Sequence, residues 1–193
     1  MRWFVGIVVA LLVGTAIYVG SAVVSLRGLI EAARAGDGAG VLARTDTARV
    51  RRSLVDQIVS AYLTRLGRDR PVKTLERLAA NTYGASIADA MIAQMLTEEN
   101  LANILNTGAI RSSCNAVANI PRLIDIDTSN VIDTLRRILP VKPVEFFVRL
   151  GPRDSAGGIS LHFEGNGWKL SGIELPSAAV EALAQNLVNR RNG

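Results

Sequence analysis

The first 26 residues contain an uncharged apolar run, which constrains the fold of this chain more than any other feature. No charged side chain occurs from Trp3 to Leu26, a run of 24 positions between Arg2 and Arg27. As an α-helix with a rise of about 1.5 Å per residue, the run is roughly 36 Å long, so it can cross a hydrocarbon core about 30 Å thick. We predict a membrane anchor over residues 1–26 and a single folded domain over residues 27–193.

The anchor has one main alternative, a cleaved secretory signal peptide with Gly20-Ser21-Ala22 as its cleavage site. The apolar run continues through Val23 and Val24, whereas the apolar part of a signal is usually about 7–15 residues long, so we favour an uncleaved anchor. A buried core helix is a third alternative, and the length of the run at the N-terminus argues against it. Membrane-spanning positions, with aromatic residues placed toward the two interfaces, are predicted at Trp3, Phe4, Val8, Leu12, Tyr18 and Val23.

The orientation of the anchor depends on the positive charges that flank it. Arg27 and Arg34, with Arg44 just beyond, outnumber Arg2 and the amino terminus, which favours a cytoplasmic domain. An N-terminal basic residue followed by an apolar run is also how export signals begin, which favours an exported domain. We predict a single-pass protein of the bacterial inner membrane with a periplasmic domain, and the cytoplasmic orientation is the alternative.

The composition of the 167 residues after the span suits one domain with a real core. They carry 21 basic and 17 acidic side chains, and almost all of the basic ones are arginine. Together with the many alanines and glycines, this is typical of codon usage in a GC-rich bacterium. A nucleic-acid interface would need clustered basic residues with aromatics for stacking, and aromatic residues make up only 5% of the chain. No nucleic-acid partner is therefore expected.

Residue types that carry catalysis or bind metals are scarce. Cys114 is the one cysteine, which excludes an intramolecular disulfide and predicts a small buried apolar side chain. His162 is the one histidine, and its alternating strand pattern predicts exposure on a sheet. Asp125, Asp127 and Asp133 lack the glycine turn and closing glutamate of a calcium loop, so they predict a solvated turn. Nucleophile-elbow, phosphate-loop and paired-histidine motifs are absent, so we predict a non-catalytic protein with no metal or cofactor.

Helical periodicity dominates the first half of the chain. An apolar stripe extends the first helix to residue 35, where Gly36 ends it and Asp37 opens a turn. Asp46 is a good N-cap for the next helix, which is expected to span residues 47–66 and to close at Gly67. Shorter helices are predicted over residues 72–80, 85–96 and 98–106, the last of them capped by Thr97.

Strand-like alternation begins after Pro140. Three runs separated by glycine-rich turns predict an antiparallel meander, and Ser177 is expected to cap a final helix. The predicted strands cover residues 144–150, 159–163 and 168–173, and the final helix covers residues 178–189. Weaker signals suggest a strand over 123–127 and a short helix over 131–138. The prediction is an α+β fold, in which several helices pack on a C-terminal antiparallel sheet of three to four strands with a final helix.

Three short motifs resemble a bacterial family known only as "domain of unknown function 2939". Its start is similar to Ala-Ala-Arg-Ala-Gly-Asp at 32–37, followed by Thr45-Asp46 and Arg52-Ser53-Leu54. Its middle resembles residues 96–101, and its end resembles residues 167–176. The chain departs from the pattern by having Gly20-Ser21-Ala22 in place of a Ser-Pro-Tyr-like junction, and by adding a C-terminal helix. The resemblance implies membrane attachment and this architecture, and it transfers no catalytic residue.

The residues of these family-like motifs also have structural interpretations: a helix stop for Gly36 and Asp37, a cap for Asp46, an ion pair of Arg52 with Asp46 or Asp56, a sheet anchor for Trp168, and a strand end for Leu175 and Pro176.

The sequence as a whole predicts a membrane-tethered binding or assembly module of the cell envelope. A pocket under the helices could take a small apolar ligand or a peptide, and an open sheet edge could accept a partner strand. A structural, oligomerising envelope protein and an enzyme without a recognisable motif are the alternatives.

Overall fold

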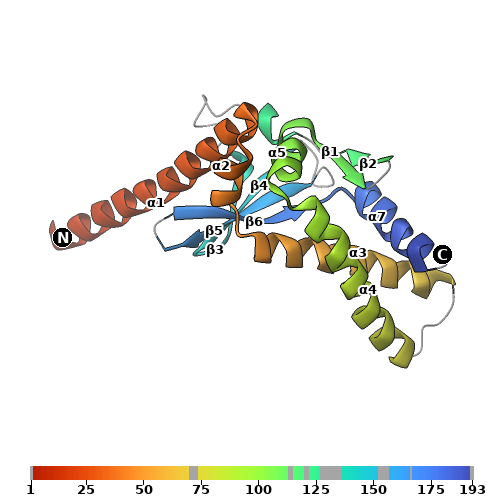
Figure 1. The fold of residues 1–193 in the computed structure, drawn as a ribbon. Helices are drawn as coiled ribbons and strands as arrows, with labels where there is room; N and C mark the ends of the chain where they lie inside the picture. The colour runs from red at the N-terminus through yellow and green to blue at the C-terminus, as the bar shows by residue number, and fades with distance from the viewer. Residues whose placement is uncertain are drawn as a thin grey trace.

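Helices precede the sheet along the chain in the computed structural model (Figure 1), which describes residues 2–69, 74–112, 115–119, 122–126, 136–151, 157–165 and 167–191. The helices are α1 (Arg2–Ala35), α2 (Gly38–Ala43), α3 (Thr47–Asp69), α4 (Thr74–Met95) and α5 (Glu98–Thr107). A hairpin of β1 (Ala109–Ser112) and β2 (Asn115–Asn119) and the 3-10 helix η1 (Leu123–Asp125) follow. The chain then forms β3 (Ile138–Lys142), β4 (Glu145–Arg149), β5 (Gly158–Glu164), β6 (Gly167–Glu174) and α7 (Ser177–Arg191). The α+β prediction is confirmed.

The main sheet is an antiparallel meander of four strands in the order β3-β4-β5-β6. Its register aligns Phe146 with Leu161 and Leu161 with Leu170, so buried apolar side chains share one face. His162 lies between Glu145 and Lys169 on the other face. The sheet therefore contains the three predicted strands and a fourth strand, β3, at one edge. Pro140 interrupts the strand pattern there, and an edge strand tolerates a proline because one of its sides needs no ladder hydrogen bonds.

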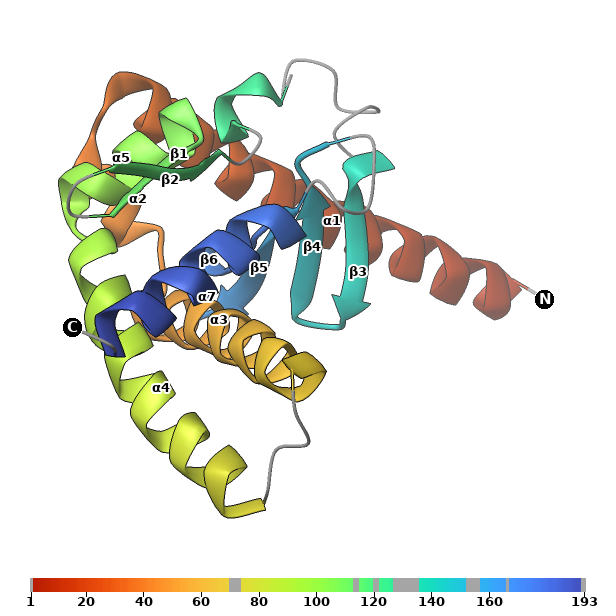
Figure 2. The same cartoon turned by 90° about the vertical axis from the view of Figure 1, so that its right-hand side faces the viewer.

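The hydrophobic core lies between the apolar face of the sheet and the helices. The helix α3 is central, because it contacts β6, α4 and α7; Figure 2 shows α7 beside α3. The second half of α1 contacts β6, α2 and α5. Its buried residues continue the same core as those of α3 and the sheet. One contiguous core thus joins the N-terminal helix to the rest of the chain.

Both edges of the sheet are blunted. On the β6 side, Leu170 forms a parallel bridge with Thr45, in which Leu170 N donates to Arg44 O (2.9 Å) and Asp46 N donates to Leu170 O (2.8 Å). On the β3 side, Pro140 lacks an N–H and the register shifts beside it. Natural sheets use such devices against unwanted strand pairing. They argue against the partner-strand hypothesis raised from the sequence.

Three predicted helix boundaries were wrong. The segments 72–80 and 85–96 were expected as separate helices, whereas α4 is continuous from Thr74 to Met95. Gly84 lies inside α4, and one interior glycine costs a helix only about 1 kcal/mol. For the same reason α3 passes through Gly67 instead of closing there.

Four local elements also differ from the predictions. The turn expected at 37–40 is the start of α2. The strand expected at 123–127 is η1, and the segment 109–119, which gave no clear signal, forms the β1–β2 hairpin. The helix expected over 131–138 is described only at its end, where residues 136–137 are helical and β3 begins at Ile138. Ser177 is inside α7 rather than its cap, because the carbonyl of Pro176 accepts from Ala179 N (2.9 Å) and Val180 N (3.1 Å).

Candidate functional site

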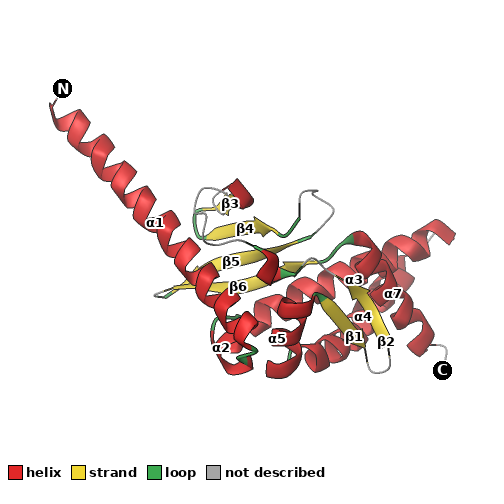
Figure 3. Cartoon of the chain, turned by 90° about the horizontal axis from the view of Figure 1, so that it is seen from above, coloured by secondary structure: helices red, strands yellow, loops and turns green. Residues whose placement is uncertain are grey.

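The helix α1 is divided into an exposed half and a half that belongs to the core. Side chains from Trp3 to Ile17 are all exposed, and this half projects away from the rest of the molecule (Figure 3). Trp3 is 88% exposed and Leu12 is 65% exposed, whereas Leu26 is fully buried. In the described part of the chain, α1 is the one helix long and apolar enough to cross a membrane, although a signal sequence would pass the same test.

The predicted membrane-spanning residues fall on both sides of this division. Trp3, Phe4, Val8 and Leu12 lie in the exposed half. Tyr18 is half-buried and Val23 is buried, and both pack against the folded domain. The core of the domain therefore includes residues of α1 well before residue 27, the predicted start of the domain.

One face of α1 stays exposed beyond residue 17. Ile17, Gly20 and Val24 lie on this outer face, and Val24 is 71% exposed. One turn further on, the face becomes charged, with an ion pair between Arg27 Nε and Glu31 Oε1 at 2.7 Å. The inner face of α1 contacts the domain from Tyr18 onward. The outer face stays exposed and apolar for about two more turns, to Val24.

An aromatic cluster joins α1 to the sheet. The ring of Trp168 lies 4.6 Å from that of Phe146, 5.1 Å from that of Tyr18 and 5.3 Å from that of Phe163, measured between ring centroids. Its indole Nε1 donates to Ser21 Oγ at 2.9 Å. The Tyr18 hydroxyl donates to the carbonyl of Pro143 in the β3–β4 turn. Trp168 of β6 therefore contacts α1 through both Tyr18 and Ser21.

The other family-like motif residues shape the connections between helices. Gly36 has a φ of 68°, a left-handed conformation that ends α1. Asp37 Oδ1 accepts from Gly40 N (2.9 Å) and caps α2, while Asp46 Oδ1 accepts from Arg49 N (3.0 Å) and caps α3. Asp46 also pairs with Arg49 (3.0 Å). The ion pair expected for Arg52 is absent among the described residues, so that expectation was wrong.

Gln57 ties α3 to the end of β6 and the start of α7, a role that the sequence did not reveal. Its Nε2 donates to Ile173 O (2.7 Å), and its Oε1 accepts from Leu175 N (2.9 Å). The side-chain amide thus takes the place of a neighbouring strand at the end of β6. Leu175 is buried, and the carbonyl of Pro176 accepts the first hydrogen bonds of α7.

Replacing Gln57 by Leu is expected to lower the free energy of unfolding by about 2–4 kcal/mol, because two backbone groups lose their partners at about 1–3 kcal/mol each. Urea unfolding of the full chain in detergent, followed by far-UV circular dichroism, measures the change. Gln57→Glu keeps the acceptor for Leu175 and should fall in between. Asp56→Asn, one residue away and exposed, should change stability by less than about 0.5 kcal/mol. An equally small effect of Gln57→Leu would contradict the assigned role.

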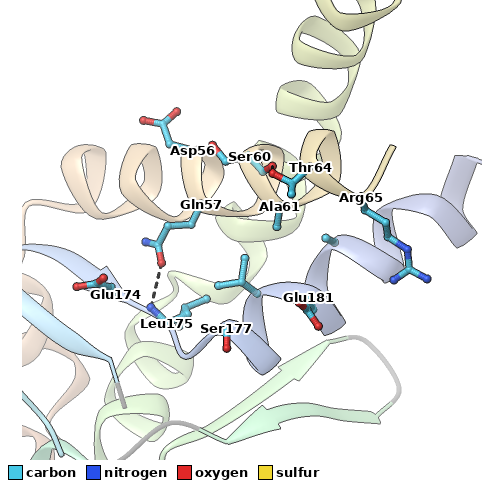
Figure 4. Close-up of a pocket in the computed structure, with 12 residues that line it drawn as sticks. Asp56, Gln57, Ser60, Ala61, Thr64, Arg65, Glu174, Leu175, Ser177 and Glu181 are labelled. Atoms are coloured by element: carbon cyan, nitrogen blue, oxygen red, sulfur yellow. Dashed lines mark hydrogen bonds between the residues drawn. The ribbon is translucent and has the colours of Figure 1, made fainter. Parts of the chain in front are cut away.

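A groove lies between α3 and α7 (Figure 4). It has a volume of about 720 Å³. Its lining is apolar at Ala61, Leu175, Val180 and Ala184. The polar part of the lining comes from α3, from the end of β6 and from the first turns of α7. These residues are Asp56, Gln57, Ser60, Thr64 and Arg65 of α3, Glu174 of β6, and Ser177 and Glu181 of α7.

The rim of this groove is acidic. Asp56, Glu174 and Glu181 are exposed and form no ion pair with any described residue. Arg65 is the one basic residue in the lining, and its Nη1 donates to Gln185 Oε1 at 3.5 Å. The groove therefore has a net negative charge on a chain whose formal net charge is +5. Such a site favours a ligand with an apolar body and a positively charged group.

A second cleft lies between α3 and α4 and has a volume of about 880 Å³. Arg51 and Asp89 face each other across it in a two-point ion pair. Hydrogen bonding to Asp89 raises the pKa of the Arg51 guanidinium against an opposing effect of desolvation, and the charge of Asp89 adds to the increase. Arg52 also lines this cleft, is exposed, and forms no ion pair with a described residue.

Of the residues considered for catalysis or metal binding, the structure describes His162 and Asp125. His162 was expected to be exposed, but it is half-buried, and its Nδ1 is shielded from solvent with no hydrogen-bond partner among the described residues. Neither cleft includes it. Asp125 is exposed at η1; Cys114, Asp127 and Asp133 lie outside the described residues. Over the described residues, no three side chains of His, Cys, Asp or Glu come together as metal ligands.

The fold and these sites define a class of protein, an α+β domain whose core incorporates an N-terminal apolar helix. Residues 10–104 match the model of a family described as "Protein of unknown function (DUF2939)". The match runs from α1 into α5 and confirms the resemblance noted in the sequence, while residues 167–176 lie beyond it. No curated protein and no solved structure matches the chain. The family description assigns no activity.

Proposed function

We propose that this chain is a membrane-anchored, non-catalytic binding module of the bacterial cell envelope. In this proposal the exposed half of α1 lies in the inner membrane, the rest of the chain forms one periplasmic domain whose core begins at Tyr18, and the α3–α7 groove takes an amphipathic cationic partner. The observation that carries the proposal is the division of α1. A helix that is apolar and exposed at one end and core-forming at the other couples a lipid anchor to a folded domain.

The contacts of α1 also support an uncleaved anchor. Cleavage at Gly20-Ser21-Ala22 would remove Tyr18 from the aromatic cluster and separate Ser21 from the Trp168 indole. A buried indole N–H without a partner costs about 1–3 kcal/mol, in addition to the lost ring contacts. Intact-mass measurement on the purified membrane fraction should therefore find the N-terminal segment still attached. A mature chain that starts after residue 20 would overturn the anchor.

The orientation is tested with two fusions after Gly193. Alkaline phosphatase is active only outside the cytoplasm, and green fluorescent protein serves as the reciprocal reporter. We expect active phosphatase and a dark fluorophore. The opposite result would place the groove in the cytoplasm, as the charges of Arg27 and Arg34 favour, and would exclude periplasmic partners.

The groove is tested with fluorescent peptides added to the full chain in a neutral detergent, with fluorescence polarisation as the readout. One peptide alternates leucine with arginine, and its control alternates leucine with glutamate. We expect the basic peptide to bind more tightly. Neutralising the three rim acids (Asp56→Asn, Glu174→Gln and Glu181→Gln together) should weaken it roughly tenfold, which corresponds to about 1.4 kcal/mol.

A matched control removes three exposed acids outside the groove: Glu98→Gln, Glu99→Gln and Asp125→Asn. This control variant has the same net charge as the groove variant, so it separates local recognition from the overall charge of the chain. Equal weakening in both variants, or equal binding of both peptides, would rule out recognition by the groove.

A further inference from the structure

The exposed apolar surface of α1 ends at different residues on its two faces: at residue 17 on the face that contacts the domain, and at Val24 on the outer face. The stretch that is exposed on all sides, residues 3–17, is about 22 Å long, which is shorter than a hydrocarbon core of about 30 Å. The outer face remains apolar to Val24, and residues 3–24 span about 33 Å, which matches that thickness. Arg27 and Glu31 then mark the end of the apolar face. If residues 3–24 cross the hydrocarbon core, the part of the domain that contacts residues 18–24 lies at the membrane interface.

The β3–β4 tip, consisting of Val141, Lys142, Pro143 and Val144, lies beside this part of α1. The Tyr18 hydroxyl donates to Pro143 O, which fixes the tip next to residue 18 of the helix. All four tip residues are exposed. Val141 is 57% exposed and Val144 is 43% exposed, so two valine side chains extend the apolar surface of α1 sideways. Lys142 is exposed between them and pairs with Glu145 (2.9 Å).

We propose that the β3–β4 tip is a second membrane contact, in which Val141 and Val144 enter the interfacial layer of a phospholipid bilayer and Lys142 lies at the level of the phosphates. This inference rests on the proposed anchor. The tip is continuous with the apolar surface of α1, and the Lys142 ammonium, one of whose N–H groups donates to Glu145, keeps further N–H donors for phosphate oxygens.

The test places a fluorophore at single positions of the full chain in phosphatidylcholine vesicles containing a minority of phosphatidylglycerol. In a Cys114→Ser background, Val141→Cys and Val144→Cys are each labelled with an environment-sensitive nitrobenzoxadiazole probe. Nitroxide lipids that carry the quencher near the headgroup or deep in the acyl chain then report the depth of the probe. Leu12→Cys in α1 is the positive control. Leu78→Cys, at an exposed apolar residue of α4, is the matched negative control, and Figure 1 shows that the first turns of α4 lie far from α1.

We expect the shallow quencher to reduce emission at positions 141 and 144 several-fold more than at position 78, and the deep quencher to act most strongly at position 12. Quenching at position 12 with none at 141 and 144 would overturn the tip contact and leave the anchor standing. No quenching at position 12 would overturn the anchor and the tip contact together. Because all four labelled side chains are exposed, far-UV circular dichroism should show an unchanged fold in every variant.

Discussion

Replacing Trp168 by Ala should lower the free energy of unfolding by about 3–5 kcal/mol, the usual cost of truncating a large buried aromatic side chain. The reason is its position: Trp168 is 4% exposed, contacts three aromatic rings and donates to Ser21 Oγ. The change removes the contacts of the Trp168 ring with Tyr18 and Ser21 and leaves a cavity between the sheet and α1. Urea unfolding of the full chain in detergent, followed by far-UV circular dichroism, measures it without depending on tryptophan emission.

The other tryptophan provides a control within the same chain. Trp3 is 88% exposed at the far end of α1, so Trp3→Ala should change the stability of the domain by less than about 0.5 kcal/mol. Trp168→Phe keeps a ring but loses the bond to Ser21, so its effect should be intermediate. If Trp168→Ala were as mild as Trp3→Ala, the aromatic cluster would not hold α1 against the sheet.

Leu26→Ala is expected to cost about 2–5 kcal/mol in the same measurement, because Leu26 is fully buried within the domain core. Leu12→Ala makes the same chemical change in the same helix, at a side chain that is 65% exposed. It should leave the unfolding of the domain unchanged within about 0.5 kcal/mol.

The contrast between these two leucines also locates the start of the domain. Equal, small effects would mean that the folded unit begins after the apolar run, at residue 27, as its uncharged composition suggested. A large effect at Leu26 alone would mean that the last part of the run is core. Two large effects would mean that α1 is packed along its whole length, which would contradict its exposed half.

Local patterns were sufficient to predict much of the fold. The four-residue repeat of apolar positions predicted α3, and Thr97, which accepts from Asn100 N, predicted the start of α5. The alternation around a Gly-rich turn predicted β5 and β6. The failures have local causes as well. Single glycines suggested helix ends at positions that the packing tolerates, and Pro140 hid β3, because a proline excludes a central strand but not an edge strand.

The sites could not be predicted in the same way, because they depend on pairs of residues that are distant in sequence. Gln57 contacts Ile173 and Leu175, and nothing in the periodicity of α3 marks it as different from other half-buried polar residues. The cluster of Trp168 with Tyr18 required knowing that the uncharged run returns to the sheet. An apolar run has the same composition whether lipid or protein covers it, so the division within α1 becomes visible only in three dimensions.

The unbroken course of α1 has a mechanical consequence. The helix continues through Gly14, Gly20 and Gly28 without a joint, so anchor and domain share one rigid axis. On the proposed anchor, the tilt of the helix in the bilayer and the tilt of the domain above it are the same angle. Because spanning helices tilt when the bilayer becomes thinner, the α3–α7 groove would swing with them, and the thickness of the membrane would set the direction in which the groove faces.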